Sequence, residues 1–178
     1  MARVSLIDEN AQPELADLIA KMRGARRGRL INVYRMLLHS PTLAATWFEH
    51  LNAVRWGTQL DGKLRELVII RVGILNRLDY VIQAHVPGLA LEEGLTLEQC
   101  GALADWSSSD LFTEAQRAAL AYTDAMTRDI SVPDAVHAGV YRVFSERQIV
   151  ELAVLIGTYN MHTRVLAALQ VDAEPAKA

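Results

Sequence analysis

Leu64–Gly94, with the sequence LRELVIIRVGILNRLDYVIQAHVPGLALEEG, holds the main information about the fold. Its apolar spacing predicts two helices, one from about Lys63 to Leu75 and one from Tyr80 onwards. Asn76 is suited to the left-handed conformation that ends a helix. Asp79 is a good N-cap for the second helix. The segment therefore predicts a central helical hairpin over about residues 63–93.

The hairpin would bring Glu66 and His85 opposite one another. In one straight helix they would lie about 28 Å apart. In a hairpin, Glu66 lies about 15 Å before the turn and His85 about 9 Å beyond Asp79. That difference is about one helical turn, which the glutamate side chain or a bridging water can span. A buried carboxylate beside an imidazole holds one tautomer and raises its basicity. The alternative is a structural histidine and a glutamate that lies at the surface or forms a salt bridge.

Two further residues of the hairpin have chemical consequences. Pro87 removes the hydrogen bond to the Gln83 carbonyl, which leaves a polar acceptor near the histidine. Arg71 lies inside an apolar run and needs a partner if it is buried. That partner is either a substrate carboxylate or a structural one, Glu66 or Glu151.

Helix signals also dominate the rest of the chain. Three capping boxes (Thr96 with Gln99, Thr113 with Gln116, Ser145 with Gln148) precede apolar-periodic runs over 97–106, 114–129 and 146–169. Further helices are predicted over 14–23, 30–38 and 42–56, and a short one follows Val132–Pro133. The expected fold class is all-α, with one domain over 1–178, an N-terminal helical extension over about 1–40, and a disordered tail over about 172–178.

Composition limits the environment and the partners. The chain has 178 residues, of which 51% are hydrophobic, and a net charge of −3. A mean hydropathy of +0.12 is high for a soluble monomer and favours apolar surface buried between subunits. The single cysteine, Cys100, favours a reducing, cytoplasmic location. The apolar runs are too short to span a bilayer, and the mild acidity favours neither nucleic acid nor membrane partners.

Several kinds of site have no sequence support. No HExxH or CxxC pattern is present, and His39 and His50 fall on different helices, so no metal is expected. Nucleotide-binding loops and the serine-hydrolase motif are also missing, so no cofactor is predicted. The basic run Lys21–Arg29 is interpreted as a solvated helix end. The alternative is docking of an anionic substrate or of a neighbouring subunit's acids.

The pattern of Arg65-Glu66-Leu67, an apolar run, Asn76, Tyr80, His85 and Gly94 resembles the core motif of the carboxymuconolactone decarboxylase / alkylhydroperoxidase D-like superfamily. Phe144–Leu169 is similar to the ending of many members. The resemblance covers about residues 33–169. It implies an alkylhydroperoxidase D-like helical bundle that forms a homo-oligomer, most typically a trimer or hexamer.

The chain departs from both main branches of that family. The peroxidase branch has Glu, eleven residues, Cys-x-x-Cys, three residues and His. Glu66 and His85 match its ends, but the cysteine positions fall on Leu78 and Val81, so its thiol chemistry is not expected. Cys100 lies outside the motif and is interpreted as a buried small hydrophobe. The decarboxylase branch often has Tyr-Glu-Trp at 80–82. Here only Tyr80 is kept, which puts 4-carboxymuconolactone in doubt as the substrate.

The resemblance and the residues together favour a cofactor-free decarboxylase, lyase or isomerase. Its substrate would be a small carboxylated lactone or related cyclic acid. The predicted roles are general acid–base for His85, orientation for Glu66, hydrogen-bond donation for Tyr80, carboxylate binding for Arg71, and apolar contact for Leu78, Val81 and Ile82. Two alternatives remain. One is a thiol-dependent hydroperoxide reductase, disfavoured because the CxxC motif is missing. The other is a non-catalytic oligomeric binding protein.

Overall fold

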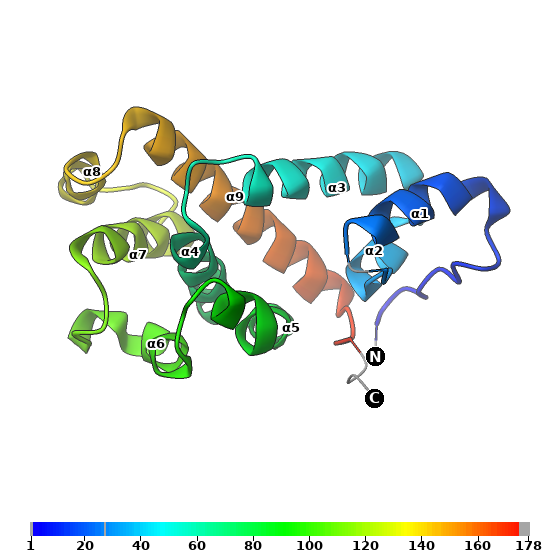
Figure 1. Cartoon of the computed structure of the whole chain (residues 1–178), viewed down its shortest axis with the longest axis horizontal. Helices are drawn as coiled ribbons and strands as arrows, with labels where there is room; N and C mark the ends of the chain where they lie inside the picture. The colour runs from blue at the N-terminus through cyan, green and yellow to red at the C-terminus, as the bar shows by residue number, and fades with distance from the viewer. Residues whose placement is uncertain (1, 27, 175–178) are drawn as a thin grey trace. The chain divides into compact units, whose positions relative to one another are not determined.

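The computed structural model describes residues 2–26 and 28–174, and within them every regular element is a helix (Figure 1). The all-α prediction is therefore confirmed. The elements are η1 (Pro13–Leu15), α1 (Ala16–Gly24), α2 (Asn32–Leu37), α3 (Pro41–Trp56), α4 (Gly62–Leu75), α5 (Asp79–Ala84), η2 (His85–Ala90), α6 (Leu97–Ala102), η3 (Leu103–Ser108), α7 (Glu114–Arg128), α8 (Asp134–Tyr141) and α9 (Glu146–Leu169). None of the described helices has the length and apolar character needed to cross a bilayer.

The predicted helix starts are confirmed by their capping bonds. At α6 the Thr96 hydroxyl accepts from the Gln99 backbone, and the Gln99 side chain accepts from the Thr96 backbone. The same reciprocal pair opens α7 at Thr113. It also opens α9, where Ser145 and Gln148 exchange the two bonds. Each box satisfies backbone donors that a helix start leaves unpaired, which is why this local signal was reliable.

The described chain divides into two compact units, Met1–Ala53 with Val165–Ala178, and Val54–Arg164. The predicted N-terminal extension lies in the first unit. The prediction of one domain over 1–178 stays a prediction.

In the first unit, the basic run has partners of its own. Arg23 donates to Glu9 and to the Gly28 carbonyl, Lys21 pairs with Glu49, and Arg26 donates to the Tyr34 hydroxyl and to Asn52. Arg27 lies outside the described residues. The described part of the run matches a helix end with local ion pairs.

The predicted disordered tail requires a correction at its start. The Ala2 backbone donates to the Asp172 carboxylate at 3.0 Å. The Asn32 backbone donates to the Glu174 side chain at 2.7 Å, and its amide donates to the Asp172 carbonyl at 3.1 Å. Hydrogen bonds therefore connect residues 172–174 to the N-terminal part of the chain. These bonds could not be predicted from the sequence, because the partners are 140 or more positions away. The remainder of the tail, 175–178, lies outside the described residues.

The second unit is built around α4, which packs against α5, α7, η2 and η3 (Figure 1). Every residue from Leu64 to Gly73 is buried. Neighbours on several sides explain why the apolar residues of this helix are not confined to one face. One face of α4 contributes to an apolar cluster made of Leu67, Ile70, Ala90, Leu95, Cys100, Leu103, Phe112 and Leu120.

The turn of the hairpin differs in detail from the prediction. Asn76 has φ −85°, and the left-handed conformation belongs to Arg77 at φ 54°. The Asn76 amide donates to Asn160 at 3.0 Å and to Thr163 at 2.7 Å, and these bonds to α9 hold it at the end of α4. The N-cap of α5 is Leu78, in an extended conformation, and Asp79 is the first helical residue. Asn76 thus ends α4 as predicted, but the left-handed conformation and the N-cap of α5 each lie one residue from the predicted position.

The second half of the hairpin has an irregular helix. Residues 85–90 form a π-helix, η2, in the segment where Pro87 was predicted to disturb the hydrogen bonding. A proline lacks the N–H that an α-helix would use there, and π turns are a known response to such a defect. Val81 in α5 approaches α4 closely, since a Cβ on Gly73 would lie 3.2 Å from Val81 Cγ1. A side chain at position 73 would therefore require Val81 to shift by a few tenths of an ångström.

Candidate active site

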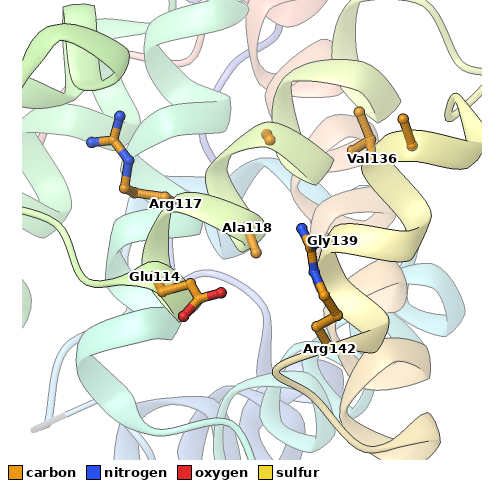
Figure 2. A pocket seen from close by; sticks show the side chains of 8 residues that line it. Glu114, Arg117, Ala118, Val136, Gly139 and Arg142 are labelled. Atoms are coloured by element: carbon orange, nitrogen blue, oxygen red, sulfur yellow. The ribbon is translucent and has the colours of Figure 1, made fainter.

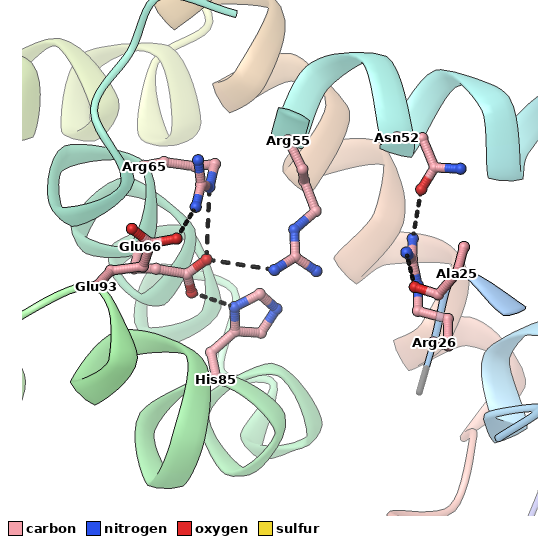
Figure 3. A network of polar contacts seen from close by, with 8 residues as sticks. All are labelled: Ala25, Arg26, Asn52, Arg55, Arg65, Glu66, His85 and Glu93. Atoms are coloured by element: carbon pink, nitrogen blue, oxygen red, sulfur yellow. Dashed lines mark hydrogen bonds and ion pairs between the residues drawn. The ribbon is translucent and has the colours of Figure 1, made fainter. Parts of the chain in front are cut away.

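Glu66 and His85 are in direct contact in the second unit. His85 Nδ1 lies 2.5 Å from Glu66 Oε2, as Figure 3 shows. Glu66 is fully buried and His85 is 6% exposed. The structure thus brings together the two residues that the hairpin geometry predicted to face each other, and the glutamate side chain alone closes the offset.

Two arginines flank the other oxygen of the Glu66 carboxylate. Arg55 Nη2 lies 3.4 Å from Glu66 Oε1, and Arg65 Nε lies 3.6 Å from the same atom. Arg65 also binds Glu93, with Nη2 at 2.5 Å from Oε1 (Figure 3). A buried carboxylate requires nearby positive charge, which these side chains supply. Sequence reasoning did not assign Arg55, Arg65 or Glu93 to the site. The adjacency of Arg65 to Glu66 was the one available signal.

Trp56 connects the two arginines. Its indole ring lies 4.8 Å from the Arg55 guanidinium carbon and 4.7 Å from that of Arg65. Cations at this distance from an aromatic face are attracted by the ring's negative charge density. Trp56 is 55% exposed, so this contact accounts for a large aromatic side chain at the surface.

The electrostatics of the pair define its protonation near neutral pH. Burial lowers the pKa of His85 below 6.5, and the charges of Arg55 and Arg65 act in the same direction against the opposing effect of Glu66. Burial on its own would raise the pKa of Glu66, but the His85 hydrogen bond and the neighbouring cations lower it below 4.5 overall. Glu66 is therefore an anion and His85 is neutral. The Nδ1–H donates to Glu66, which leaves a lone pair on Nε2 for use as a general base.

A second buried histidine lies near this pair. The rings of His85 and Tyr159 are 5.9 Å apart in an edge-to-face arrangement, and those of Tyr159 and His162 are 5.7 Å apart. Burial, followed by the charges of His85 and Arg55, lowers the pKa of His162 to about 3. His162 is thus neutral at physiological pH. From the sequence, Tyr159 could bind a ligand or tie helices together and His162 could line an interface, but no motif connects either residue to His85.

Protein stability should fall in mildly acidic solution. The pKa values of His85 and His162 lie below 6.5 in the folded protein because burial disfavours their charged forms. Below pH 6.5 the unfolded chain then binds more protons, so the free energy of unfolding decreases as the pH falls. Each histidine contributes a slope of up to about 1.4 kcal/mol per pH unit, and none above pH 7. Urea unfolding from pH 8 to pH 4.5 measures this, and a constant free energy between pH 7 and pH 5 would contradict it.

The ion-pair partner of Arg71 differs from the partners predicted for it. Its Nε and Nη2 each lie 2.6 Å from an Asp124 oxygen, and Nη1 donates to the carbonyls of Leu103 and Ala104. The partner is neither Glu66 nor Glu151. Because its donors are used inside the protein, Arg71 has a structural ion pair in place of the predicted substrate contact.

The other predicted residues lie around the start of α5. Val81 is 1% exposed and packs on Gly73 of α4, so it belongs to the contact between the helices. Leu78, Tyr80 and Ile82 are half-buried. Tyr80 precedes His85 by five residues, which places it about 140° away around a regular helix. Roles for Leu78, Tyr80 and Ile82 in binding a substrate stay predictions.

Cys100 lies in the apolar cluster around α4. It is 6% exposed, and burial raises the pKa of its thiol. A thiol in these surroundings is a poor nucleophile, because the thiolate is the reactive form. The structure agrees with the interpretation of Cys100 as a small hydrophobe. Among the described residues, no three His, Cys, Asp or Glu side chains gather as a metal site would require.

A cavity of about 530 Å³ lies between α7 and α8 (Figure 2). Its lining is largely made of small or apolar residues, with charged groups near them: Ala118, Ala121, Val136, Gly139, Glu114 and Arg142. Arg117, which also lines the cavity, donates to the carbonyls of Trp106, Ser107 and Ser109. The cavity does not include the Glu66–His85 pair and holds no comparable acid–base group.

Gly62 leaves the space that the Glu93 carboxylate occupies. A Cβ on Gly62 would lie only 1.6 Å from Glu93 Oε2. Gly62→Ala should therefore displace this carboxylate from Arg65 and lower the free energy of unfolding by about 1 kcal/mol, since the pair is partly solvated. Gly101→Ala is the control, because nothing lies within 4 Å of its Cβ position, and it should be neutral or stabilising. Equal effects of the two changes in urea unfolding would show that Glu93 moves at no cost.

Comparisons with known proteins agree with this fold. The model of the carboxymuconolactone decarboxylase family matches residues 41–125. An uncharacterised peroxidase-related protein from Silicibacter sp. TM1040 has a TM-score of 0.83 at 20% identity, covering 97% of this chain and 92% of that one. The debrominase Bmp8 has a TM-score of 0.80 at 20% identity, covering 96% of this chain and 91% of its own. The family model over residues 41–125 and the fold shared with these structures support the resemblance to the carboxymuconolactone decarboxylase / alkylhydroperoxidase D-like superfamily.

A curated relative is the uncharacterised protein YnjA of Escherichia coli (strain K12). It is 28% identical over 116 residues, which are 65% of this chain and 63% of that protein. The match thus spans less than two thirds of the relative's length. A proposal for the activity therefore rests on the family resemblance and on the Glu66–His85 site.

Proposed function

We propose that this protein is a cofactor-free enzyme that moves a proton on a small carboxylated lactone or related cyclic acid. The reaction class is decarboxylation, isomerisation or lyase-type elimination. The 2.5 Å contact between His85 Nδ1 and the buried Glu66 carboxylate is the observation that supports it. A neutral imidazole fixed in one tautomer by an anion is the standard arrangement of a general base.

The proposed chemistry needs only the groups in place. His85 Nε2 takes a proton from a substrate carbon, and the electrons of the broken C–H bond stay on the substrate as an enolate. The Glu66 carboxylate stabilises the imidazolium that forms. Return of the proton to another carbon completes an isomerisation. In a decarboxylation, the C–C bond to the departing carbon dioxide breaks and its electrons stay on the substrate as an enolate. The carbon then takes a proton that His85 relays from water, and His85 ends in its neutral form.

Thiol-dependent peroxide reduction is the disfavoured alternative. Structural relatives include a protein described as peroxidase-related, and the debrominase Bmp8 has also been solved as a cysteine-to-alanine variant with 2,3,4-tribromopyrrole. In this chain the two motif positions are Leu78 and Val81, and Cys100 is buried with a raised pKa. Consumption of a hydroperoxide with a dithiol reductant that is lost in Cys100→Ser would favour this alternative.

The test is hydrogen exchange in deuterated water. Small lactones, muconate-like acids and cyclic or aromatic carboxylic acids are incubated with the protein, and loss of C–H signals is followed by proton NMR. An enzyme of proton transfer exchanges a C–H of its substrate even when the full reaction is slow. Exchange by the wild type that is lost in His85→Gln would support the proposal. No exchange with any compound would favour a non-catalytic binding protein.

A further inference from the structure

We propose that Arg55 is the residue that binds the substrate's carboxylate, next to the Nε2 atom of His85. That the bound acid is a substrate rests on the proposed function. The anion site itself follows from the side chains alone. The expected ligand is a small organic acid whose carboxylate lies close to the C–H that His85 would deprotonate.

The first argument is an unused buried donor. Arg55 is 9% exposed, and its Nε has no hydrogen-bond partner. Its contact with Glu66 is long, at 3.4 Å. Leaving a buried charged donor without an acceptor costs about 1–3 kcal/mol or more, so such a group calls for a ligand or ordered water.

Two other buried arginines, Arg71 and Arg65, each have a short contact with a carboxylate. Arg71 places Nε and Nη2 at 2.6 Å from the two oxygens of Asp124. Arg65 Nε has no hydrogen bond either, but its Nη2 binds Glu93 at 2.5 Å. Arg55 has no comparably short contact with a carboxylate. Arg55 is therefore the arginine of the site whose guanidinium can still bind a carboxylate through two hydrogen bonds.

The second argument is position. Figure 3 shows the Arg55 guanidinium extending from the end of α3 toward Glu66 and His85. The positive charge of Arg55 contributes to the lowered pKa of both His85 and His162. Arg55 and His85 contact the same carboxylate, at 3.4 Å and 2.5 Å from the two oxygens of Glu66, so the two side chains lie at one carboxylate. A carboxylate on Arg55 would thus hold the adjacent carbon of the acid near the base.

Binding should also change the histidines. A carboxylate on Arg55 offsets the charge that disfavours the imidazolium, so the pKa values of His85 and His162 should rise in the complex. The other charged groups of the site, Arg65, Glu66 and Glu93, are paired with one another. A neutral ligand of the same shape would leave both histidines unchanged.

The experiment titrates the full chain with benzoate and with its neutral isostere benzamide. Binding is followed by the ring signals of the histidines in NMR and by calorimetry. The variants are Arg55→Gln and Arg55→Lys, with Arg147→Gln as the control, since Arg147 is an exposed arginine paired with Glu151. Thermal unfolding of each variant is recorded first. Arg55→Lys keeps the charge beside Glu66 if Arg55→Gln does not fold.

We expect benzoate to shift the signals of His85 and His162 and to bind at least 10-fold more tightly than benzamide. Arg55→Gln should weaken benzoate binding by about 10–100-fold, Arg55→Lys less, and Arg147→Gln not at all. Equal binding of benzoate and benzamide, unchanged affinity in both Arg55 variants, or no benzoate binding by the wild type would overturn the assignment.

The two proposals fail separately. Benzoate binding at Arg55 without deuterium exchange on any acid would keep the anion site and remove the proposed enzyme. Exchange that depends on His85 but is equal in the wild type and Arg55→Lys, for acids and for neutral lactones alike, would keep the enzyme and remove Arg55 as its carboxylate-binding residue.

Discussion

Replacing His85 with glutamine is expected to slow C–H exchange on the substrate by about 10²–10⁴-fold, the usual contribution of a general base. Glutamine can still donate to Glu66 but has no basic lone pair with which to accept a proton. Glu66 would keep the cations of Arg55 and Arg65, so no isolated charge is left in the core. The rate of deuterium incorporation at saturating acid, together with a thermal melt, measures the two effects separately.

The matched control is His137→Gln, an exposed histidine on α8. It should leave both the exchange rate and the melting temperature near those of the wild type. An exchange rate that survives in His85→Gln would assign the base to another group. A variant that fails to fold would point to a structural histidine.

Replacing Asp124 with alanine is expected to give a large loss of stability, about 3–5 kcal/mol, because it leaves a buried cation without its partner. Arg71 is 3% exposed, and both oxygens of Asp124 lie 2.6 Å from its guanidinium. At about 2–4 °C for each kcal/mol in a chain of this length, the melting temperature should fall by roughly 6–20 °C. Urea unfolding gives the free energy directly.

Arg128→Ala provides the control, since Arg128 is an exposed partner of the same carboxylate at 3.5 Å. Such pairs contribute at most about 1 kcal/mol. The double variant Arg71→Met with Asp124→Leu removes both charges and should recover much of the loss. A change below 1 kcal/mol for Asp124→Ala would mean that water reaches Arg71.

The parts of the fold that depend on neighbours in sequence could be predicted. The capping boxes at Thr96, Thr113 and Ser145 are made by residues three positions apart, so the sequence displays both partners. Asn76 ends α4 as predicted, but the left-handed conformation lies at Arg77, and the Asn76 side chain bonds to Asn160 and Thr163, more than 80 positions away. No local pattern contains that information.

The candidate site divides in the same way. Glu66 and His85 could be placed opposite one another because both belong to one hairpin of predictable length. The partner of Arg71 was missed, since Asp124 is 53 residues further along. Arg55 was missed because it comes from α3, outside the motif. Its role depends on a missing acceptor, which a sequence cannot show.

The π-helix η2 has a consequence for insertions and deletions. His85 and Ala90 are both buried, although they are five residues apart. In a regular α-helix this spacing would turn them about 140° away from each other. The wider turn brings positions five apart back to the same side of the helix. Removing one residue between them would leave them four apart, about 40° around a regular α-helix, so both could stay inside. Winding the present six residues as a regular α-helix would instead turn one of the two outward. Among relatives, we therefore expect this segment either to keep its length together with the π turn or to be one residue shorter and regularly α-helical.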